Sequence, residues 1–277
     1  MPRYQSPYDP ATTPKNLEHV LYEKKGHVAY VTINRPDVRN ALHSYAYVEL
    51  RSCWRDIGLD PDIYVAIVTG AGPAVCAGRD VKFLAQHQSE GKRTPHEDPN
   101  SPIFHWGGGG MPNDVTLDKP LIAAINGFAV GVGLNIILQC QLRVMVEDAW
   151  IGDQHTNVGR VGAPHEMYAA LPRTTAAYLT LCNGRLTAQE CLQQAVVNKV
   201  VPKDQLIPAA EQLAEMICLG SPLAVQAAIR LYRLTASFPP SLLAYARHLD
   251  QEIAETEDGA EGARAFKEKR RPAWKLR

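Results

Sequence analysis

The sequence predicts an α/β core followed by a mainly helical C-terminal region, on the basis of three observations. Short apolar runs of strand length alternate with helically spaced segments through the N-terminal half of the chain, which is typical of α/β proteins. One such run leads directly into a glycine-spaced turn at residues 126–133. From Ala188 onward, apolar residues recur mainly at helical intervals. The chain has 277 residues and 45% hydrophobic content, enough to bury one large core or two modest ones.

The individual strands and helices follow from the spacing of apolar residues. Residues 28–33 show an alternating pattern and predict a strand with one exposed face. Continuous apolar runs predict buried strands at residues 65–68 and 121–125, and a further strand is predicted at residues 142–146. Helical spacing is found at residues 44–56, 135–141, 209–218, 223–234 and 241–256. Between the strands, the polar, proline-rich residues 86–115 predict a long loop, and loops of that length are usually functional lids or disordered.

Charge and cysteine usage exclude several classes of function. The net charge is +0, so there is no electrostatic case for nucleic acid or an anionic membrane as a partner. The six cysteines are scattered without C-x-x-C pairs, which argues against zinc or another metal and favours a reduced setting. The N-terminus is polar and proline-rich, unlike a signal peptide or a membrane anchor. We therefore expect a cytoplasmic protein.

The glycine-spaced segment at residues 126–139, NGFAVGVGLNIILQ, is the most informative stretch. Gly127, Gly131 and Gly133 allow close approach of other backbone segments. A strand, glycine turn and helix in this order directs unpaired backbone N–H groups and a positive helix end toward whatever lies in front. No Lys-Ser/Thr pair follows, so this is not a phosphate loop. The segment is either an anion-stabilising site or a plain buried strand–helix junction.

Three ordered segments and a C-terminal one form a recognisable pattern. Residues 34–42 read NRPDVRNAL, residues 75–80 read VCAGRD, and both precede the glycine-spaced turn. Near the C-terminus, residues 265–272 read AFKEKRRP. This pattern closely resembles the crotonase (enoyl-CoA hydratase/isomerase) superfamily, whose motifs are N-R-P-x-x-x-N-A-L, F-x-A-G-x-D, N-G-x-A-x-G-G-G and A-F-x-E-K-R-x-P. The resemblance runs from about Glu18 to Trp274, nearly the whole chain.

The resemblance implies a fold, an assembly and a substrate class. The fold is a spiral of repeated ββα units, expected here at residues 18–205, after a polar N-terminal extension at 1–17. A C-terminal helical region, expected at residues 206–277, packs against neighbouring subunits in homotrimers or dimers of trimers. The substrate is an acyl-CoA thioester, so coenzyme A enters as part of the substrate and no separate cofactor is expected.

The resemblance also implies an oxyanion hole made of two backbone N–H groups. One belongs to Arg79, the residue after A-G in A-G-x-D, and the other to Val132, at the middle glycine of the family turn. Ala77, Gly78 and Gly131 flank these donors and are expected to contact the substrate. Rigid main-chain donors that meet developing charge are each worth about 3–4 kcal/mol. Val132 must keep a negative φ, because β-branched residues tolerate positive φ poorly.

The two catalytic glutamates of family hydratases are absent from this chain. Asn135 stands where the first is expected, in G-G-G-x-E, and His155 stands where the second is expected, in the segment IGDQH. Gly159 matches the family glycine beyond that segment and is a further candidate for substrate contact. Ordinary hydration uses both glutamates to activate water and to protonate Cα, so this departure puts simple enoyl-CoA hydratase activity in doubt.

Four polar residues are candidates for the altered chemistry. His155 suits general acid–base catalysis because imidazole titrates near neutral pH, and the amide of Asn135 can only orient a partner. Alternatively, His155 and Asn135 merely fill the vacated pocket and hydrogen-bond each other. Asp153 either pairs with His155 or is a solvated loop carboxylate, and it is also a candidate for substrate contact. Glu166 either supplies a missing carboxylate or stabilises the start of a helix.

These residues favour an acyl-CoA lyase or isomerase with an altered acid–base set. The candidate reactions are hydration or dehydration of an unusual enoyl-CoA, double-bond isomerisation, and hydrolytic C–C or thioester cleavage. A non-catalytic acyl-CoA binding protein is the first alternative. A β-diketone hydrolase that binds no coenzyme A is the second, because some relatives use a histidine at this segment.

Overall fold

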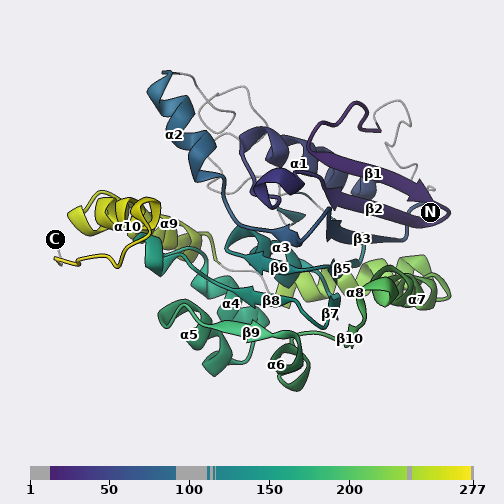
Figure 1. The fold of residues 1–277 in the computed structure, drawn as a ribbon. Coiled ribbons are helices and arrows are strands. Elements are labelled where there is room, and N and C mark those ends of the chain that lie inside the picture. Colours follow the sequence, from purple (N-terminus) through teal and green to yellow (C-terminus); the bar gives the residue numbers. More distant parts are fainter. Residues whose placement is uncertain (1–12, 92–110, 113–114, 116, 236–238, 276–277) are drawn as a thin grey trace.

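The computed structural model describes residues 13–91, 111–112, 115, 117–235 and 239–275 (Figure 1). Most of the predicted N-terminal extension and the greater part of the predicted loop at 86–115 lie outside these residues. The first residues of that loop are helical instead, because α2 (Val81–Ser89) continues to Ser89. Asp80 caps this helix, since its Oδ1 accepts a hydrogen bond from Phe83 N at 3.1 Å.

The larger of two sheets has six strands, in the order β1-β2-β3-β5-β7-β10. Their bounds are β1 Val20–Lys25, β2 Val28–Ile33, β3 Val65–Gly70, β5 Leu121–Ile125, β7 Leu142–Val146 and β10 Lys199–Val201. Only β1 and β2 pair antiparallel, and the other neighbours are parallel. Parallel strands are usually covered on both faces, which explains why β3 and β5 are almost wholly apolar and buried. All four predicted strands are confirmed.

The second sheet has four short strands, in the order β4-β6-β8-β9. Their bounds are β4 Ala74–Cys76, β6 Phe128–Val130, β8 Trp150–Gly152 and β9 Arg185–Thr187. Each of β4, β6 and β8 directly follows a strand of the larger sheet, and a helix comes next in the chain. The unit is therefore strand, strand, helix, repeated three times as β3-β4-α2, β5-β6-α3 and β7-β8-α4. This repetition is the ββα spiral that the resemblance implied.

Ten α-helices lie in the described residues. Their remaining bounds are α1 Ser44–Leu59, α3 Val132–Gln139, α4 Pro164–Ala170, α5 Arg173–Leu181, α6 Ala188–Gln193, α7 Leu206–Cys218, α8 Pro222–Thr235, α9 Pro240–Ala254 and α10 Glu257–Glu268. The predicted helix at 135–141 begins three residues earlier, at Val132. Gly131 has φ +55°, and this glycine-only turn lets the helix begin at once after β6.

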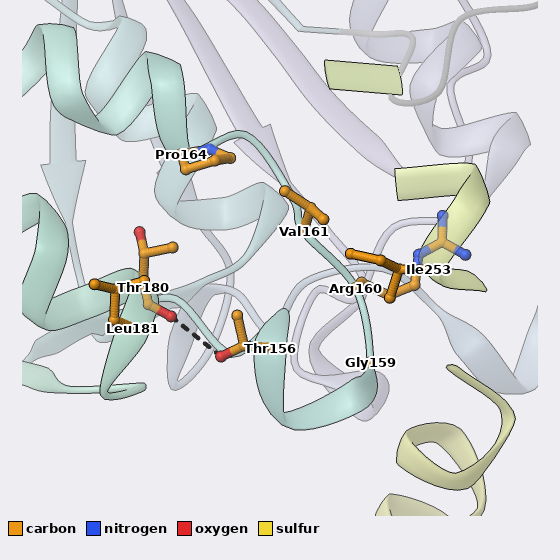
Figure 2. Close-up of a pocket in the computed structure, with 8 residues that line it drawn as sticks. All are labelled: Thr156, Gly159, Arg160, Val161, Pro164, Thr180, Leu181 and Ile253. Atoms are coloured by element: carbon orange, nitrogen blue, oxygen red, sulfur yellow. Dashed lines mark hydrogen bonds between the residues drawn. The ribbon is translucent and has the colours of Figure 1, made fainter. Parts of the chain in front are cut away.

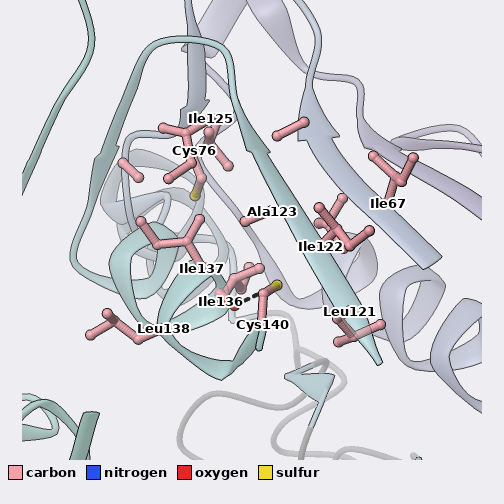
Figure 3. Close-up of a cluster of buried hydrophobic side chains, with 14 of the residues drawn as sticks. Ile67, Cys76, Leu121, Ile122, Ala123, Ile125, Ile136, Ile137, Leu138 and Cys140 are labelled. Atoms are coloured by element: carbon pink, nitrogen blue, oxygen red, sulfur yellow. Dashed lines mark hydrogen bonds between the residues drawn. The ribbon is translucent and has the colours of Figure 1, made fainter. Parts of the chain in front are cut away.

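The core packs α3 directly against the larger sheet (Figure 3). Ile136 and Ile137 on α3 are fully buried, as are Ile122 and Ile125 on β5. Each fully buried isoleucine stabilises the fold by roughly 1.5–3 kcal/mol. The first turn of α3, which carries Val132, is therefore fixed relative to the sheet.

The C-terminal helices separate into two groups (Figure 1). Helix α7 packs against β3, β5 and β7, whereas α9 and α10 lie on the opposite side of the molecule. Helix α10 packs on the 3₁₀ turn Thr156–Val158, and Gly262 permits this, because an added Cβ would lie 2.5 Å from Val158 C. Among the described residues, no single helix is long and apolar enough to cross a membrane. One pair of consecutive helical segments, 203–218 and 222–234, has the length and composition of a membrane span only when taken together, and the two are bent by 107° relative to each other.

His43 makes the start of α1 sensitive to acid. Its Nδ1 accepts a hydrogen bond from Ala46 N at 3.2 Å, and its ring packs against His19 and Phe83. Burial, with smaller contributions from Arg35 and His19, lowers the pKa of His43 from 6.5 to about 4. The unfolded chain takes up this proton near pH 6.5 and the folded chain only near pH 4. Stability is therefore lost as pH falls between these values.

We expect His43→Asn to reduce the acid-induced decrease in the free energy of unfolding by about 3 kcal/mol. Asparagine retains the capping acceptor and carries no titrating group. The measurement is the free energy of unfolding by urea at pH 7 and pH 4 in both proteins. Equal pH dependence in the two would contradict the assignment.

Candidate active site

The backbone N–H of Arg79 does not take part in the hydrogen bonds that join its turn to Leu42. Gly78 O accepts a hydrogen bond from Leu42 N at 2.8 Å, and Asp80 N donates to Leu42 O at 2.8 Å. These bonds flank Arg79, whose own N–H has no hydrogen-bond partner among the described residues. Gly78 has φ +102°, which an L side chain rarely adopts, so this turn needs glycine.

Val132 occupies the first position of α3 and keeps a negative φ, as the prediction required. A first-turn N–H has no partner within its own helix, and the Val132 N–H finds none elsewhere in the described chain. The turn before it is held by two hydrogen bonds, Gly131 N to Gly152 O at 3.2 Å and Asn135 N to Gly131 O at 3.0 Å. The unpaired N–H is therefore rigidly placed at the positive end of the helix.

The turns that carry these two N–H groups touch each other. A Cβ added to Gly78 would lie 3.3 Å from Val130 O, and one added to Gly131 would lie 3.9 Å from Gly78 Cα. Gly133 packs still more closely on the strand before the Gly78 turn, because a Cβ added to Gly133 would lie 2.5 Å from Cys76 O. The glycines thus permit backbone contact between segments far apart in sequence. The structure brings two unpaired donors onto adjacent turns, an arrangement suited to stabilising an oxyanion.

Residues of the first motif hold the Arg79 turn in place. Asn40, with φ +60°, accepts a hydrogen bond from Arg35 N and donates to Ala71 O and Ala74 O. Arg35 pairs with the buried carboxylate of Asp80 at 3.0 Å. Arg35, Asn40 and Asp80 are therefore architectural. Ala77 is also tied to this motif, because its N–H donates to Arg39 O at 3.0 Å.

His155 lies directly against the glycine turn of α3. A Cβ added to Gly131 would lie 3.5 Å from His155 Cε1 and 3.8 Å from Nε2. On the other side of the ring, a Cβ added to Gly162 would lie 2.4 Å from Nδ1. The ring is thus held between two glycines, and its Nε2 edge faces the turn that presents the Val132 N–H. Its side chain is 23% exposed.

Asp153, and not Asn135, is the hydrogen-bond partner of His155. The Nδ1 atom of His155 pairs with Asp153 Oδ1, and the Asp153 side chain is buried. Asn135 is half-buried one helical turn after Gly131, and its amide has no hydrogen-bond partner among the described residues. The alternative of an Asn135–His155 bond is therefore not what the structure shows. A solvated Asp153 is also wrong, because β8 ends at Gly152 and carries Asp153 inward.

Two other candidates have structural explanations. Glu166 lies in the first turn of α4, which packs on α3, and a carboxylate there favours the helix dipole. Burial lowers the pKa of the neighbouring His165. Gly159 has φ +67°, and a Cβ added there would lie 2.9 Å from Asp258 O and from Gly259 Cα on α10. Gly159 is thus required for packing on α10, and its contact with substrate stays a prediction.

An open pocket of about 320 Å³ lies beside the segment that follows His155 (Figure 2). It is lined by Thr156, Gly159, Arg160, Val161, Pro164, Thr180, Leu181 and Ile253. The lining includes neither His155 nor the two N–H donors, so this pocket is separate from the candidate site. Within the described residues, no three histidine, cysteine, aspartate or glutamate side chains are grouped to hold a metal ion.

Sequence reasoning missed two groups of residues that support His155. Gly162 contacts the ring, yet the sequence shows only a glycine near a proline in a loop. Arg160 pairs with Asp250 on α9, and Val161 N donates to the same carboxylate at 3.0 Å. No local pattern indicates this pairing, because the partners are 90 residues apart.

Comparison with known proteins agrees with this architecture. A model of the family described as enoyl-CoA hydratase/isomerase matches residues 23–277. The chain is 34% identical over 261 residues to (E)-benzylidenesuccinyl-CoA hydratase of Thauera aromatica, covering 92% of this chain and 98% of that protein. It is 31% identical over 272 residues to carnitinyl-CoA dehydratase of Salmonella enteritidis, covering 94% and 99%. The crystal structure of carnitinyl-CoA hydratase from Mycobacterium avium matches with a TM-score of 0.79 at 31% identity, covering 94% and 99%.

The ββα spiral and the paired glycine turns together define a crotonase-type protein. The chain belongs to the enoyl-CoA hydratase/isomerase family and is an acyl-CoA enzyme of that family. The relatives named above are hydratases and dehydratases, which are lyases.

Proposed function

We propose that this protein catalyses the reversible hydration of a substituted enoyl-CoA, with His155 as its acid–base group. The observation that carries the proposal is the contact between the His155 ring and the Gly131 turn, where an unpaired N–H is found. The thioester oxygen binds the backbone N–H groups of Arg79 and Val132. Coenzyme A enters as part of the substrate, and no separate cofactor takes part.

One imidazole is sufficient for both proton transfers. In the dehydration direction, His155 Nε2 takes the Cα proton of a 3-hydroxyacyl thioester, and the electron pair moves onto the thioester oxygen. The two N–H groups stabilise this enolate charge. The enolate then expels the 3-hydroxyl group, which takes the proton back from His155 and leaves as water. Asn135 orients that hydroxyl group through its amide and moves no proton.

The substrate proposal draws on the absence of both family glutamates. Family hydratases use two carboxylates to activate water and protonate Cα, whereas this site has one imidazole and one amide, so an ordinary enoyl-CoA is not the expected substrate. Two relatives are named for the benzylidenesuccinyl and carnitinyl thioesters, both substituted acyl groups. The acyl group of this protein's substrate is accordingly a substituted one.

The proposed function is tested with a panel of CoA thioesters at neutral pH. We expect crotonyl-CoA to be hydrated far more slowly than tens of turnovers per second, and a substituted enoyl-CoA to be turned over at an ordinary enzymatic rate. Fast crotonyl-CoA hydration would show that the missing glutamates do not matter. Thioester binding without any turnover favours the binding-protein alternative, and turnover of a β-diketone without CoA binding favours the hydrolase.

The assembly proposed for this enzyme is a homotrimer or a dimer of trimers. Large apolar side chains are exposed along α8 and just before it, among them Leu219, Leu223, Leu231 and Leu234. Exposed apolar groups of this kind are typical of protein interfaces. Sedimentation equilibrium gives the mass directly, and a monomer would contradict the proposal.

A further inference from the structure

A buried carboxylate lies behind the catalytic edge of His155. The Asp153 side chain is 1% exposed, and its Oδ1 pairs with His155 Nδ1. Its second oxygen, Oδ2, is buried without a hydrogen-bond partner among the described residues. In the described part of the chain, His155 is therefore the one side chain that this carboxylate binds.

Such a carboxylate is costly for the fold. A buried carboxylate needs several hydrogen bonds or an ion pair to offset the loss of its hydration. Asp153 has one partner, the imidazole of His155. Other buried carboxylates in this protein are better satisfied: Asp80 pairs with Arg35, and Glu261 pairs with Arg264 and Arg270. Stability alone therefore gives little reason for an aspartate at position 153.

The backbone fixes the direction in which Asp153 acts. Gly152, the last residue of β8, accepts the hydrogen bond from Gly131 N, so Asp153 begins one residue beyond the point that binds the glycine turn. From there its carboxylate reaches Nδ1, while Nε2 and Cε1 face Gly131. An ionised carboxylate only accepts hydrogen bonds, so Nδ1 must carry the proton and a neutral ring has a bare Nε2.

We propose that Asp153 is a positioning residue that holds the ring proton of His155 on Nδ1 and thereby makes Nε2 the proton-transferring atom. This inference rests on the proposed role of His155. Asp153 also acts through its negative charge, which stabilises the imidazolium that forms when Nε2 takes a proton. The role matches that of a carboxylate behind a histidine base, where loss of the carboxylate lowers turnover by about 10⁴-fold.

Nitrogen NMR of the whole protein tests the inference without any assay. Ring ¹⁵N shifts distinguish the Nδ1–H from the Nε2–H form of neutral histidine, and the spectrum of His155→Gln identifies the His155 signals among the nine histidines. In the wild type at a pH where the ring is neutral, we expect a protonated Nδ1 and a bare Nε2. A proton found on Nε2 overturns the inference.

Two substitutions add a kinetic readout. Asp153→Ala removes the acceptor, so the ring proton should move to Nε2, and kcat should fall by about 100- to 10,000-fold with KM within a few-fold. Asp153→Asn keeps the shape and removes the charge, so it should also lower kcat without lowering the melting temperature. Asp56→Asn is the matched control: this buried carboxylate binds Tyr22 and Lys24, so its loss should reduce stability and leave kcat unchanged.

The outcomes separate this inference from the proposed function. If Asp153→Ala leaves both the tautomer and kcat unchanged while His155→Ala is inactive, the positioning role fails and the function stands. If Asp153→Ala moves the proton to Nε2 and kcat is unaffected, Asp153 sets the tautomer and the proposed role of His155 fails. A fall in kcat that accompanies the change of tautomer supports both.

Discussion

Replacing His155 with alanine is expected to lower kcat by about two to four orders of magnitude, while ligand affinity stays within a few-fold. The reason is that His155 combines a suitable acid–base group with a position against the glycine turn, and no other titratable side chain of the described residues is found there. Removal of the imidazole leaves the two backbone N–H groups intact, so binding of the thioester oxygen persists. Steady-state kinetics on the substituted enoyl-CoA identified by the panel give kcat, and calorimetric titration gives the affinity.

Asn135→Ala is the graded control for this experiment. Its amide lies on the same helix as Val132 and moves no proton, so its loss should cost less than that of His155, on the order of one hydrogen bond or about 1 kcal/mol. Near-normal turnover of His155→Ala would mean that the proton travels through another group. Glu166, in the first turn of α4, would then be the residue to replace next.

Gly162→Ala is expected to lower kcat by about 100-fold without removing any chemical group of the site. The added Cβ would lie 2.4 Å from Nδ1 and 2.7 Å from Cγ of His155, so the ring must move. Displacement of a catalytic group by about 1 Å is enough to cost 100-fold in rate. The measurements are kcat on the same substrate and a crystal structure that shows the shifted ring.

The chain offers a matched control for the backbone strain in this variant. Gly26 has φ +56°, close to the φ +68° of Gly162, and a Cβ at Gly26 would meet nothing within 4 Å. Both alanine variants therefore carry a left-handed residue, which costs roughly 1–2 kcal/mol of stability, and only Gly162→Ala touches His155. If the two variants have equal kcat, contact with Gly162 does not position the ring.

Much of the fold was predictable because its signals are local. The buried strands and the glycine turn follow from apolar runs and glycine positions within a few residues of each other, and the structure confirms them. Where prediction was inexact, a local detail of backbone geometry decided the outcome. Helix α3 starts at Val132 because Gly131 turns the chain, and α2, whose start Asp80 caps, extends to Ser89 into a segment predicted to be a loop.

The candidate site was predictable in part. The motif positions identified His155, Arg79 and Val132, and the structure places all three at the contact between the Gly78 and Gly131 turns. The partners of these residues were not predictable. Asp153 had two interpretations of equal merit, and only the inward end of β8 decides for the buried pair with His155.

The sequence by itself predicted four strands of the larger sheet, five of the ten helices in the described residues and the glycine turn before α3, and the family resemblance located the two N–H donors and the replaced glutamates at Asn135 and His155. These depend on the spacing of residues along one segment. Tertiary structure alone decided that Gly159 packs on α10, that Gly162 holds the His155 ring and that Asp250 binds Arg160. The physical reason is that such contacts join surfaces brought together by burial of the whole core, and their geometry leaves no periodic trace in either segment.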